Sequence, residues 1–231
     1  MNVRAFTSRA EFDAAAADHF YRSANAAIAK SGRFTVALTG GTTPSPVYEL
    51  MATPEYARLA DWRLIQVFWG DERCVGPEDP QSNDGMAQRT LLSRVPIPQE
   101  NIHRIRGELD PATAAAEYEK VVRDVVSESF DLIILGMGSD GHIASLFPNS
   151  PLLQEKARWV ASQYVEKVKM ARVTLTPVAI NRAHAVVFWV AGDDKQRALS
   201  RVLDGPRDPA LLPAQIVAPR GELTWLTLAK R

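Results

Sequence analysis

The sharpest chemical signal in the sequence is a glycine-rich turn, residues 136–142, that holds a carboxylate and an imidazole two positions apart, Asp140 and His142. Histidine is the usual general base near neutral pH, and a neighbouring carboxylate can orient the imidazole and stabilise its protonated form. The turn directly follows an apolar run, residues 130–135, so both side chains are expected at the end of a buried strand. The alternative is an aspartate that caps the turn beside a packed histidine, and the flanking glycines favour the catalytic interpretation.

A second glycine-rich segment, residues 39–44, has the composition of an anion-binding loop. Gly40 and Gly41 offer unhindered backbone amides, Thr42 adds a hydroxyl, and a helical pattern follows. Orphan amides and the dipole at a helix N-terminus both favour a phosphate. The spacing matches neither a Walker A loop nor a dinucleotide-binding fingerprint. A tight turn with hydroxyl caps is an equally good interpretation of this segment alone.

Charged side chains follow two further strand-like segments. Lys195 comes three residues after Gly192, where its ammonium could reach a phosphate as a point charge, although a lysine in this position is more often solvent-exposed. Asp71, Glu72 and Arg73 follow another apolar run. Arg73 could bind an anion, or the three residues could form an internal ion-pair network, and the sequence does not favour either alternative.

Several common kinds of hydrolytic chemistry lack their motifs. The chain has no G-x-S-x-G nucleophile elbow and no H-E-x-x-H segment, and its single cysteine, Cys74, cannot form a zinc cage. Serine nucleophiles and zinc therefore have no support, and we expect neither a metal nor another cofactor. Direct attack by an activated water is the simplest remaining hypothesis.

The elements that would position these residues alternate between strands and helices. Apolar runs that do not alternate in polarity predict buried parallel strands at residues 34–38, 64–69, 130–135, 185–190 and 224–228. Capping residues and helical patterns predict helices at 8–32, 47–51, 83–95, 110–126, from 176 onward, and at 195–203. This pattern indicates a doubly wound α/β fold, a mainly parallel sheet with helices on both faces, in a single domain over residues 1–231. The polar loops then meet at the carboxyl edge of the sheet.

Charge balance and the N-terminus limit the choice of partners. Lys plus Arg and Asp plus Glu number 27 each, so the formal net charge is zero. Nucleic-acid and membrane binders normally carry a basic excess, so we expect neither partner, and a local cluster must hold any anionic ligand. The N-terminus has no apolar signal core and no apolar run has membrane-spanning length, which favours a cytoplasmic location. The chain could be a monomer or a dimer.

Four segments together resemble the 6-phosphogluconolactonase family. They begin at residues 37, 67, 131 and 172 and read ALTGGTTPSPVYELM, VFWGDERCVGPEDPQSND, DLIILGMGSDGHIASLFPNS and RVTLTPVAINRAHAVVFWVAGDDK. The resemblance implies a Rossmann-like fold shared with glucosamine-6-phosphate deaminases and ribose-5-phosphate isomerases. It also implies hydrolysis of 6-phospho-D-glucono-1,5-lactone to 6-phosphogluconate in the oxidative pentose phosphate pathway, without a metal or cofactor.

The resemblance also implies roles for individual residues. Gly40, Gly41 and Thr42 with Lys195 would hold the phosphate, and His142 would be the catalytic base. Arg73 and Arg172 would contact the phosphate or the lactone, and Asp71 and Asp140 would be polar members of the site; these substrate-binding and catalytic assignments cover Gly40, Gly41, Thr42, Asp71, Arg73, Asp140, His142, Arg172 and Lys195.

Two other functions compete with lactone hydrolysis. The deaminase branch carries a glutamate seven residues after the aspartate of its D-G-H turn, whereas this sequence has Phe147 there, within an S-L-F-P run that matches the lactonases. A non-enzymatic sugar-phosphate sensor could keep the phosphate loop, but it would have no need for a base at the position of His142.

Overall fold

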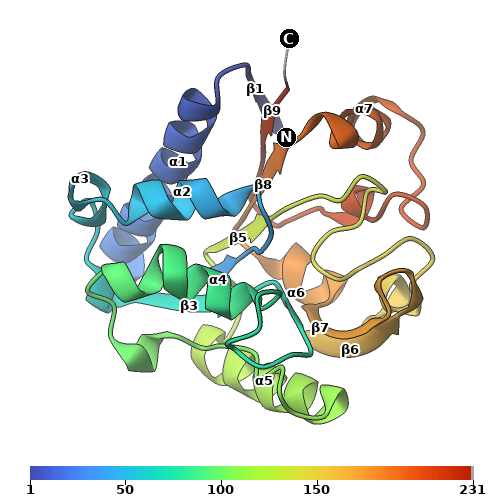
Figure 1. The fold of residues 1–231 in the computed structure, drawn as a ribbon, viewed down its shortest axis with the longest axis horizontal. Coiled ribbons are helices and arrows are strands. Elements are labelled where there is room, and N and C mark those ends of the chain that lie inside the picture. The colour runs from blue at the N-terminus through green and yellow to red at the C-terminus, as the bar shows by residue number, and fades with distance from the viewer. Residues whose placement is uncertain (230–231) are drawn as a thin grey trace.

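A six-stranded parallel sheet forms the centre of the computed structural model, which describes residues 1–229 (Figure 1). Its strand order is β1-β9-β8-β5-β2-β3, and every neighbouring pair is parallel. The strands are β1 (Asn2–Phe6), β2 (Phe34–Leu38), β3 (Ile65–Trp69), β5 (Leu132–Leu135), β8 (Ala185–Ala191) and β9 (Glu222–Leu228). The five strands expected from apolar runs are confirmed, and β1 is an additional edge strand. β2 and β5 are buried at every position, as strands covered on both faces must be.

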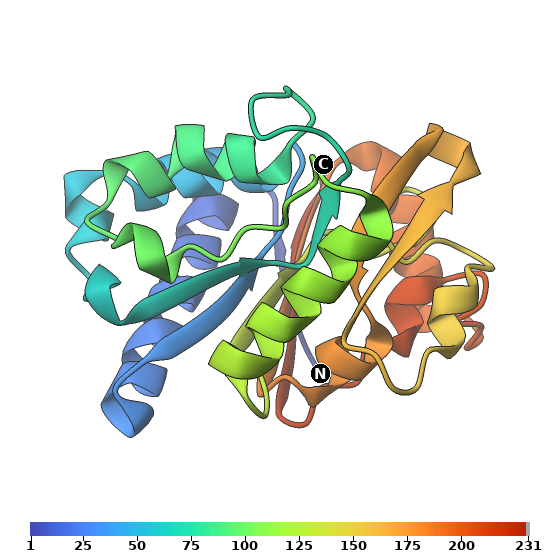
Figure 2. The ribbon, with the colours of Figure 1, turned by 90° about the horizontal axis from the view of Figure 1, so that it is seen from below.

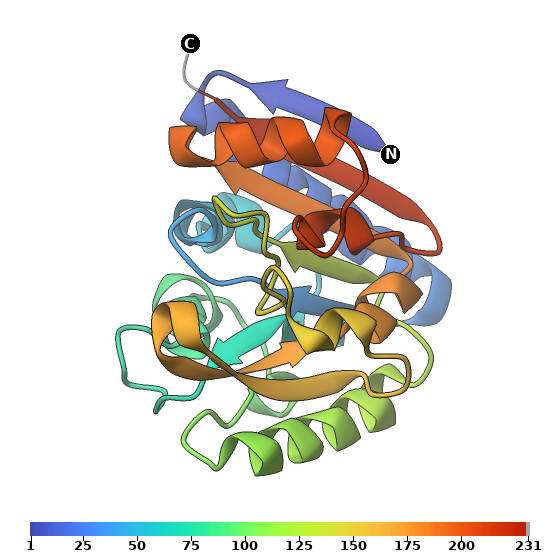
Figure 3. The same ribbon diagram turned by 90° about the vertical axis from the view of Figure 1, so that its right-hand side faces the viewer.

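Helices cover both faces of this sheet, which confirms the doubly wound α/β class. They are α1 (Arg9–Ser31), α2 (Pro44–Met51), α3 (Pro54–Ala57), α4 (Asn83–Thr90), α5 (Pro111–Val126), α6 (Pro177–Arg182) and α7 (Gln196–Asp204). Figure 3 shows α7 in front of the sheet and α1 behind it. None of the helices within residues 1–229 is both long and apolar enough to cross a membrane.

Capping residues determine several of the helix ends as expected. The Ser8 hydroxyl accepts from the amide of Glu11, and Gly32 ends α1 in the left-handed conformation at φ +75°. Asp110, directly before Pro111, caps α5 by accepting from the amides of Ala112 and Thr113. The helix expected over residues 83–95 is shorter, because α4 stops at Thr90 and a 3₁₀ turn, Leu92–Arg94, follows.

A second, antiparallel sheet extends from the carboxyl end of β3 and was not predicted. It has the order β4-β7-β6, with β4 (Asp71–Arg73), β6 (Val160–Val165) and β7 (Met170–Leu175). β6 and β7 form a hairpin that packs against α5 (Figure 2). The β4–β7 register places Arg73 directly opposite Arg172 and Asp71 opposite Thr174, so it carries residues from distant parts of the chain to one place.

The strand order changes direction between β2 and β5. From β2 the chain moves outward to β3, whereas from β5 it moves the other way through β8 to β9. In open α/β sheets, ligands bind in the crevice at the carboxyl ends of the strands beside such a switch point. The loops that follow β2 and β5, residues 39–43 and 136–142, are the two glycine-rich segments of the sequence.

Candidate active site

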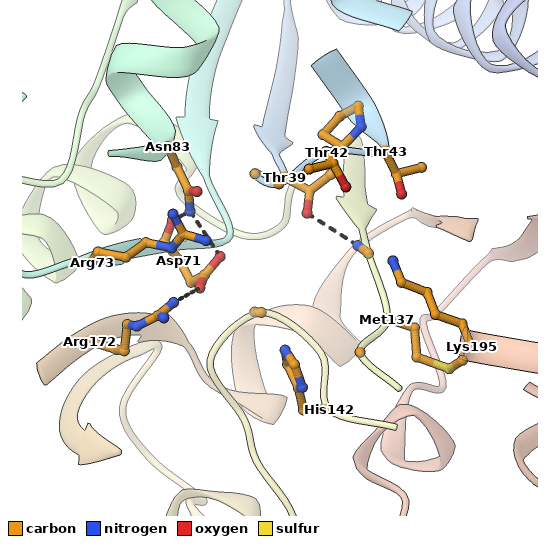
Figure 4. A pocket seen from close by; sticks show the side chains of 16 residues that line it. Thr39, Thr42, Thr43, Asp71, Arg73, Asn83, Met137, His142, Arg172 and Lys195 are labelled. Carbon is orange, nitrogen blue, oxygen red and sulfur yellow. Dashed lines mark hydrogen bonds and ion pairs between the residues drawn. The ribbon is translucent and has the colours of Figure 1, made fainter. Parts of the chain in front are cut away.

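A cavity of about 330 Å³ lies at this switch point. The structure brings eight of the nine sequence-predicted site residues to its wall, and these are Gly40, Gly41, Thr42, Asp71, Arg73, His142, Arg172 and Lys195. The ninth, Asp140, is not in the wall but lies behind His142, bonded to its ring. Figure 4 shows Lys195 and the threonines of the first loop on one side, Asp71, Arg73 and Arg172 on the other, and His142 between them.

The loop after β2 forms one end of the cavity. A Cβ atom on Gly40 would lie 1.8 Å from Asn83 Oδ1, so only glycine lets the backbone approach α4 this closely. The Thr39 hydroxyl accepts from the Gly136 amide at 3.2 Å and joins the two glycine-rich loops. The side chain of Lys195 extends toward this loop (Figure 4). Burial lowers the pKa of Lys195, although the negative charge of Asp194 opposes this shift. An anion bound at this end would therefore interact with a partly desolvated cation.

Two arginines form the other end. Arg73 and Arg172 are cross-strand neighbours on β4 and β7, where like charges are destabilising unless an opposite charge lies between them. Burial lowers the pKa of Arg172; Asp71 opposes this shift and Arg73 adds to it. Both Nε atoms are buried and have no hydrogen-bond partner within residues 1–229. The pair is therefore suited to an anionic or strongly polar substrate group.

Asp71 lies between these arginines and the interior. Its carboxylate accepts from the Ser145 hydroxyl at 2.6 Å, and Arg172 Nη1 lies 3.8 Å from the same oxygen. Asn83 Nδ2 donates to its backbone carbonyl at 2.8 Å. The ion pair of Asp71 is thus formed with Arg172 on another strand rather than within the triplet 71–73. These contacts hold β4 against the loop that carries Ser145, and a catalytic role for Asp71 stays a prediction.

Glu72 has a structural role, whereas its neighbours Asp71 and Arg73 line the cavity. Its buried carboxylate accepts from the amides of Arg73, Asn83 and Asp84 at 2.8 Å each and from the Ser82 hydroxyl at 3.1 Å. Burial raises its pKa, and the three amide hydrogen bonds oppose that shift. Glu72 therefore ties β4 to the start of α4, which places Asn83 against Gly40.

The turn after β5 presents the imidazole. Asp140 Oδ1 lies 2.5 Å from His142 Nδ1 and also accepts from the His142 amide at 3.1 Å. A Cβ atom on Gly138 would lie 2.1 Å from Nδ1, so this pair requires glycine there. The Phe147 ring stacks on the imidazole with centroids 4.2 Å apart and 19° between the planes. With Nδ1 occupied by Asp140, Nε2 is the nitrogen left to act on a substrate or water in the cavity.

The charge state of Asp140 supports this orientation. Partial burial raises its pKa, but hydrogen bonds from His142 and Lys167 together outweigh burial and hold the pKa well below its usual range. Lys167 Nζ lies 2.5 Å from Asp140 Oδ2. Asp140 is therefore ionised at neutral pH, accepts from Nδ1, and stabilises an imidazolium when one forms.

Sequence reasoning missed Asn83, Ser145 and Lys167. Asn83 lies at the expected start of a helix after a strand, a position that could have identified it as a candidate site residue. Ser145 and Lys167 carry no comparable signal, because their carboxylate partners lie 74 and 27 positions away in the chain. Lys195, expected just inside a helix, belongs to a 3₁₀ turn, Asp193–Lys195, that leads into α7.

Comparisons with known proteins relate the chain to one family. Residues 7–225 match the family model described as glucosamine-6-phosphate isomerases/6-phosphogluconolactonase. A 6-phosphogluconolactonase from Nostoc sp. is 42% identical over 207 residues, which cover 87% of this chain and 84% of that protein. One from Synechocystis sp. has the same identity and coverage. The crystal structure of a 6-phosphogluconolactonase from Thermotoga maritima superposes with a TM-score of 0.87 at 30% identity and covers 99% of both chains.

Proposed function

We propose that this chain, which belongs to the glucosamine-6-phosphate isomerase/6-phosphogluconolactonase family, hydrolyses 6-phospho-D-glucono-1,5-lactone to 6-phospho-D-gluconate in the oxidative pentose phosphate pathway. One observation carries the proposal. The His142 imidazole, hydrogen-bonded to Asp140, lies in the cavity between the glycine loop after β2, which the Lys195 side chain faces, and a pair of arginines. That arrangement suits a substrate with a phosphate at one end and a reactive carbonyl near its middle.

The reaction needs a base and an acid in turn. His142 Nε2 removes a proton from water as the water oxygen attacks C1, and the carbonyl electrons move to the oxygen. As the carbonyl re-forms, the bond from C1 to the ring oxygen breaks, and the imidazolium returns its proton to that oxygen. The products are an acid, which ionises, and a free hydroxyl at C5. A lactone carbonyl is already electrophilic, so no covalent intermediate is required.

The remaining residues of the site bind the substrate and stabilise the charges that develop during the reaction. Arg73 and Arg172 supply donors for the negative charge that develops on the carbonyl oxygen. Gly40, Gly41 and Thr42 with Lys195 hold the phosphate, whose binding energy fixes C1 against the base. Asp140 orients the imidazole and stabilises its protonated form.

Two observations favour this reaction over its competitors. Phe147, at the position of the deaminase glutamate, stacks on His142 and offers no carboxylate for opening an amino-sugar ring. A sugar-phosphate sensor would need the phosphate loop but not an imidazole that a carboxylate orients at 2.5 Å. The deaminase and sensor hypotheses are therefore the weaker ones.

A panel of three substrates tests the proposed function. The purified protein should accelerate acid release from freshly generated 6-phosphogluconolactone strongly over the spontaneous rate. It should act weakly on unphosphorylated gluconolactone, which lacks the anchor, and release no ammonia from glucosamine 6-phosphate. Ammonia release without lactone hydrolysis would support the deaminase branch, and phosphate-dependent binding with no turnover would support the sensor.

Metal independence is a separate prediction. Within residues 1–229 no group of three or more His, Cys, Asp and Glu side chains is arranged to hold a metal ion. Hydrolysis of the phosphorylated lactone should therefore be unchanged after exhaustive treatment with EDTA. Activity that disappears with the chelator and returns on adding a divalent cation would contradict the water activation described here.

A further inference from the structure

The hairpin of β6 and β7 reaches the acid–base pair through one side chain. Lys167 lies in the 3₁₀ turn between the two strands, Glu166–Val168, and its ammonium is 2.5 Å from Asp140 Oδ2. The other oxygen of the same carboxylate faces His142 Nδ1, also at 2.5 Å. The carboxylate of Asp140 therefore divides its two oxygens between a lysine from the hairpin and the imidazole.

We propose that Lys167 is a positioning residue for the lactone hydrolysis, which it assists by fixing the Asp140 carboxylate in the orientation that directs His142 Nε2 into the cavity. The inference rests on the proposed function, because it concerns the base of that reaction. It adds a residue that lies outside the cavity wall, in the turn of the same hairpin whose strand β7 carries Arg172.

The other contacts of the imidazole do not fix its orientation. Phe147 stacks on the ring, but stacking is the same when the ring turns by half a rotation and exchanges its nitrogens with its carbons. The hydrogen bond to Asp140 distinguishes the two orientations, and it requires Oδ1 to stay in place. The ammonium of Lys167 on Oδ2 opposes rotation of the carboxylate.

The exposure of this pair indicates where its effect should appear. The Lys167 side chain is 61% exposed and the Asp140 side chain 20%. Ion pairs this exposed contribute little to folding stability. Removal of Lys167 should therefore leave the melting temperature almost unchanged and act on the chemistry.

The sign of the electrostatic effect follows from the charges around the pair. Glu166 and Lys167 lie beside Asp140 on the hairpin side. The charged residues that line the cavity with His142 are Asp71, Arg73, Arg172 and Lys195. Without the lysine cation, Asp140 stabilises the imidazolium more strongly, so the base becomes protonated at a higher pH. The acid limb of the kcat/KM profile should move upward by about half a pH unit, a size that solvent screening of an exposed charge allows.

The test compares three variants with the wild type across pH. In Lys167→Met, kcat at the optimum should fall about tenfold, as is typical when a partner that orients a functional residue is lost, while KM stays within about twofold. Lys167→Arg, which keeps the cation, should restore most of kcat and the position of the acid limb. Lys169→Met removes the same charge from an exposed position in the same hairpin and should behave as the wild type.

A double variant shows whether Lys167 acts through Asp140. In an Asp140→Asn background, Lys167→Met should lower kcat little further, because the carboxylate that Lys167 positions is already absent. A full additional loss there, or an acid limb of Lys167→Met that superposes on the wild-type limb, would overturn the proposal. These outcomes are distinct from failure of the proposed function, in which the wild type itself would not accelerate hydrolysis of the phosphorylated lactone. They are also distinct from failure of the base assignment, in which His142→Asn would retain the wild-type acid limb and kcat.

Discussion

Replacement of His142 by asparagine should lower kcat for the phosphorylated lactone about 10²–10⁴-fold, the range that a general acid–base group contributes. Asparagine keeps hydrogen-bonding groups near Asp140, but it cannot take a proton from water or return one to the ring oxygen. The fold should survive, because the His142 side chain is 29% exposed and its loss leaves no large void in the core. The measurement is steady-state acid release, corrected for spontaneous hydrolysis.

Binding and a matched control complete this prediction. The inhibition constant of the product, 6-phosphogluconate, should change little in His142→Asn, because the phosphate end of the cavity lies elsewhere. His103 stacks on Phe68 and is bonded to Gln66, away from the cavity wall, so His103→Asn should leave kcat unaffected. A folded His142→Asn protein with near-normal kcat would remove His142 from its role and make Asp71 the next candidate.

Replacement of Lys195 by alanine should remove a charge-assisted contact worth about 1.5–3 kcal/mol. Roughly 10- to 150-fold would then be lost from kcat/KM on 6-phosphogluconolactone. Unphosphorylated gluconolactone, which has no phosphate to place beside the lysine, should be hydrolysed at nearly the wild-type rate. Equal losses on both substrates would instead give Lys195 a structural or catalytic role.

The pH dependence of binding offers a second test of Lys195. Because burial lowers its pKa, the free protein keeps this cation only up to a pH below the usual range for lysine. Affinity for 6-phosphogluconate should therefore be full at neutral pH and fall as the pH rises through that lowered value. Lys195→Arg, which stays charged, should lose affinity less on the alkaline side. A binding curve with the same alkaline decline in Lys195→Ala would contradict the assignment.

Much of the fold could be predicted because its signals are local. Ser8 and Gly32 lie directly at the two ends of α1, where they cap it. The strands β2, β5 and β8 are themselves apolar runs, so their own sequences indicate buried strands. β1, by contrast, is an edge strand with four exposed positions and carries no apolar run. β4 forms because it pairs with β7, which lies far along the chain, and local patterns do not report such a partner. β6 and β7 pair locally as a hairpin, but neither strand is a continuous apolar run.

In the candidate site, too, residues with a local sequence signal could be predicted, and residues placed by tertiary contacts could not. His142 and the Gly40–Thr42 segment could be recognised because glycine-rich turns after buried strands meet at one sheet edge. The exact surroundings depend on tertiary contacts: Arg172 reaches Arg73 only through the β4–β7 register, and Lys167 reaches Asp140 only through the hairpin. Physical reasoning from the sequence can therefore name a candidate base and a candidate anion loop that meet at one cavity, but not the residues that contact them from distant parts of the chain.

The pH dependence of kcat/KM, measured for the wild type and His142→Asn on 6-phosphogluconolactone between about pH 5 and pH 8, tests the central claim most directly. If His142 is the base, the wild-type value falls on the acid side as the imidazole gains a proton, and the residual activity of the variant lacks that limb. An acid limb of the same position and steepness in His142→Asn would show that another group takes the proton from water, and would contradict the account.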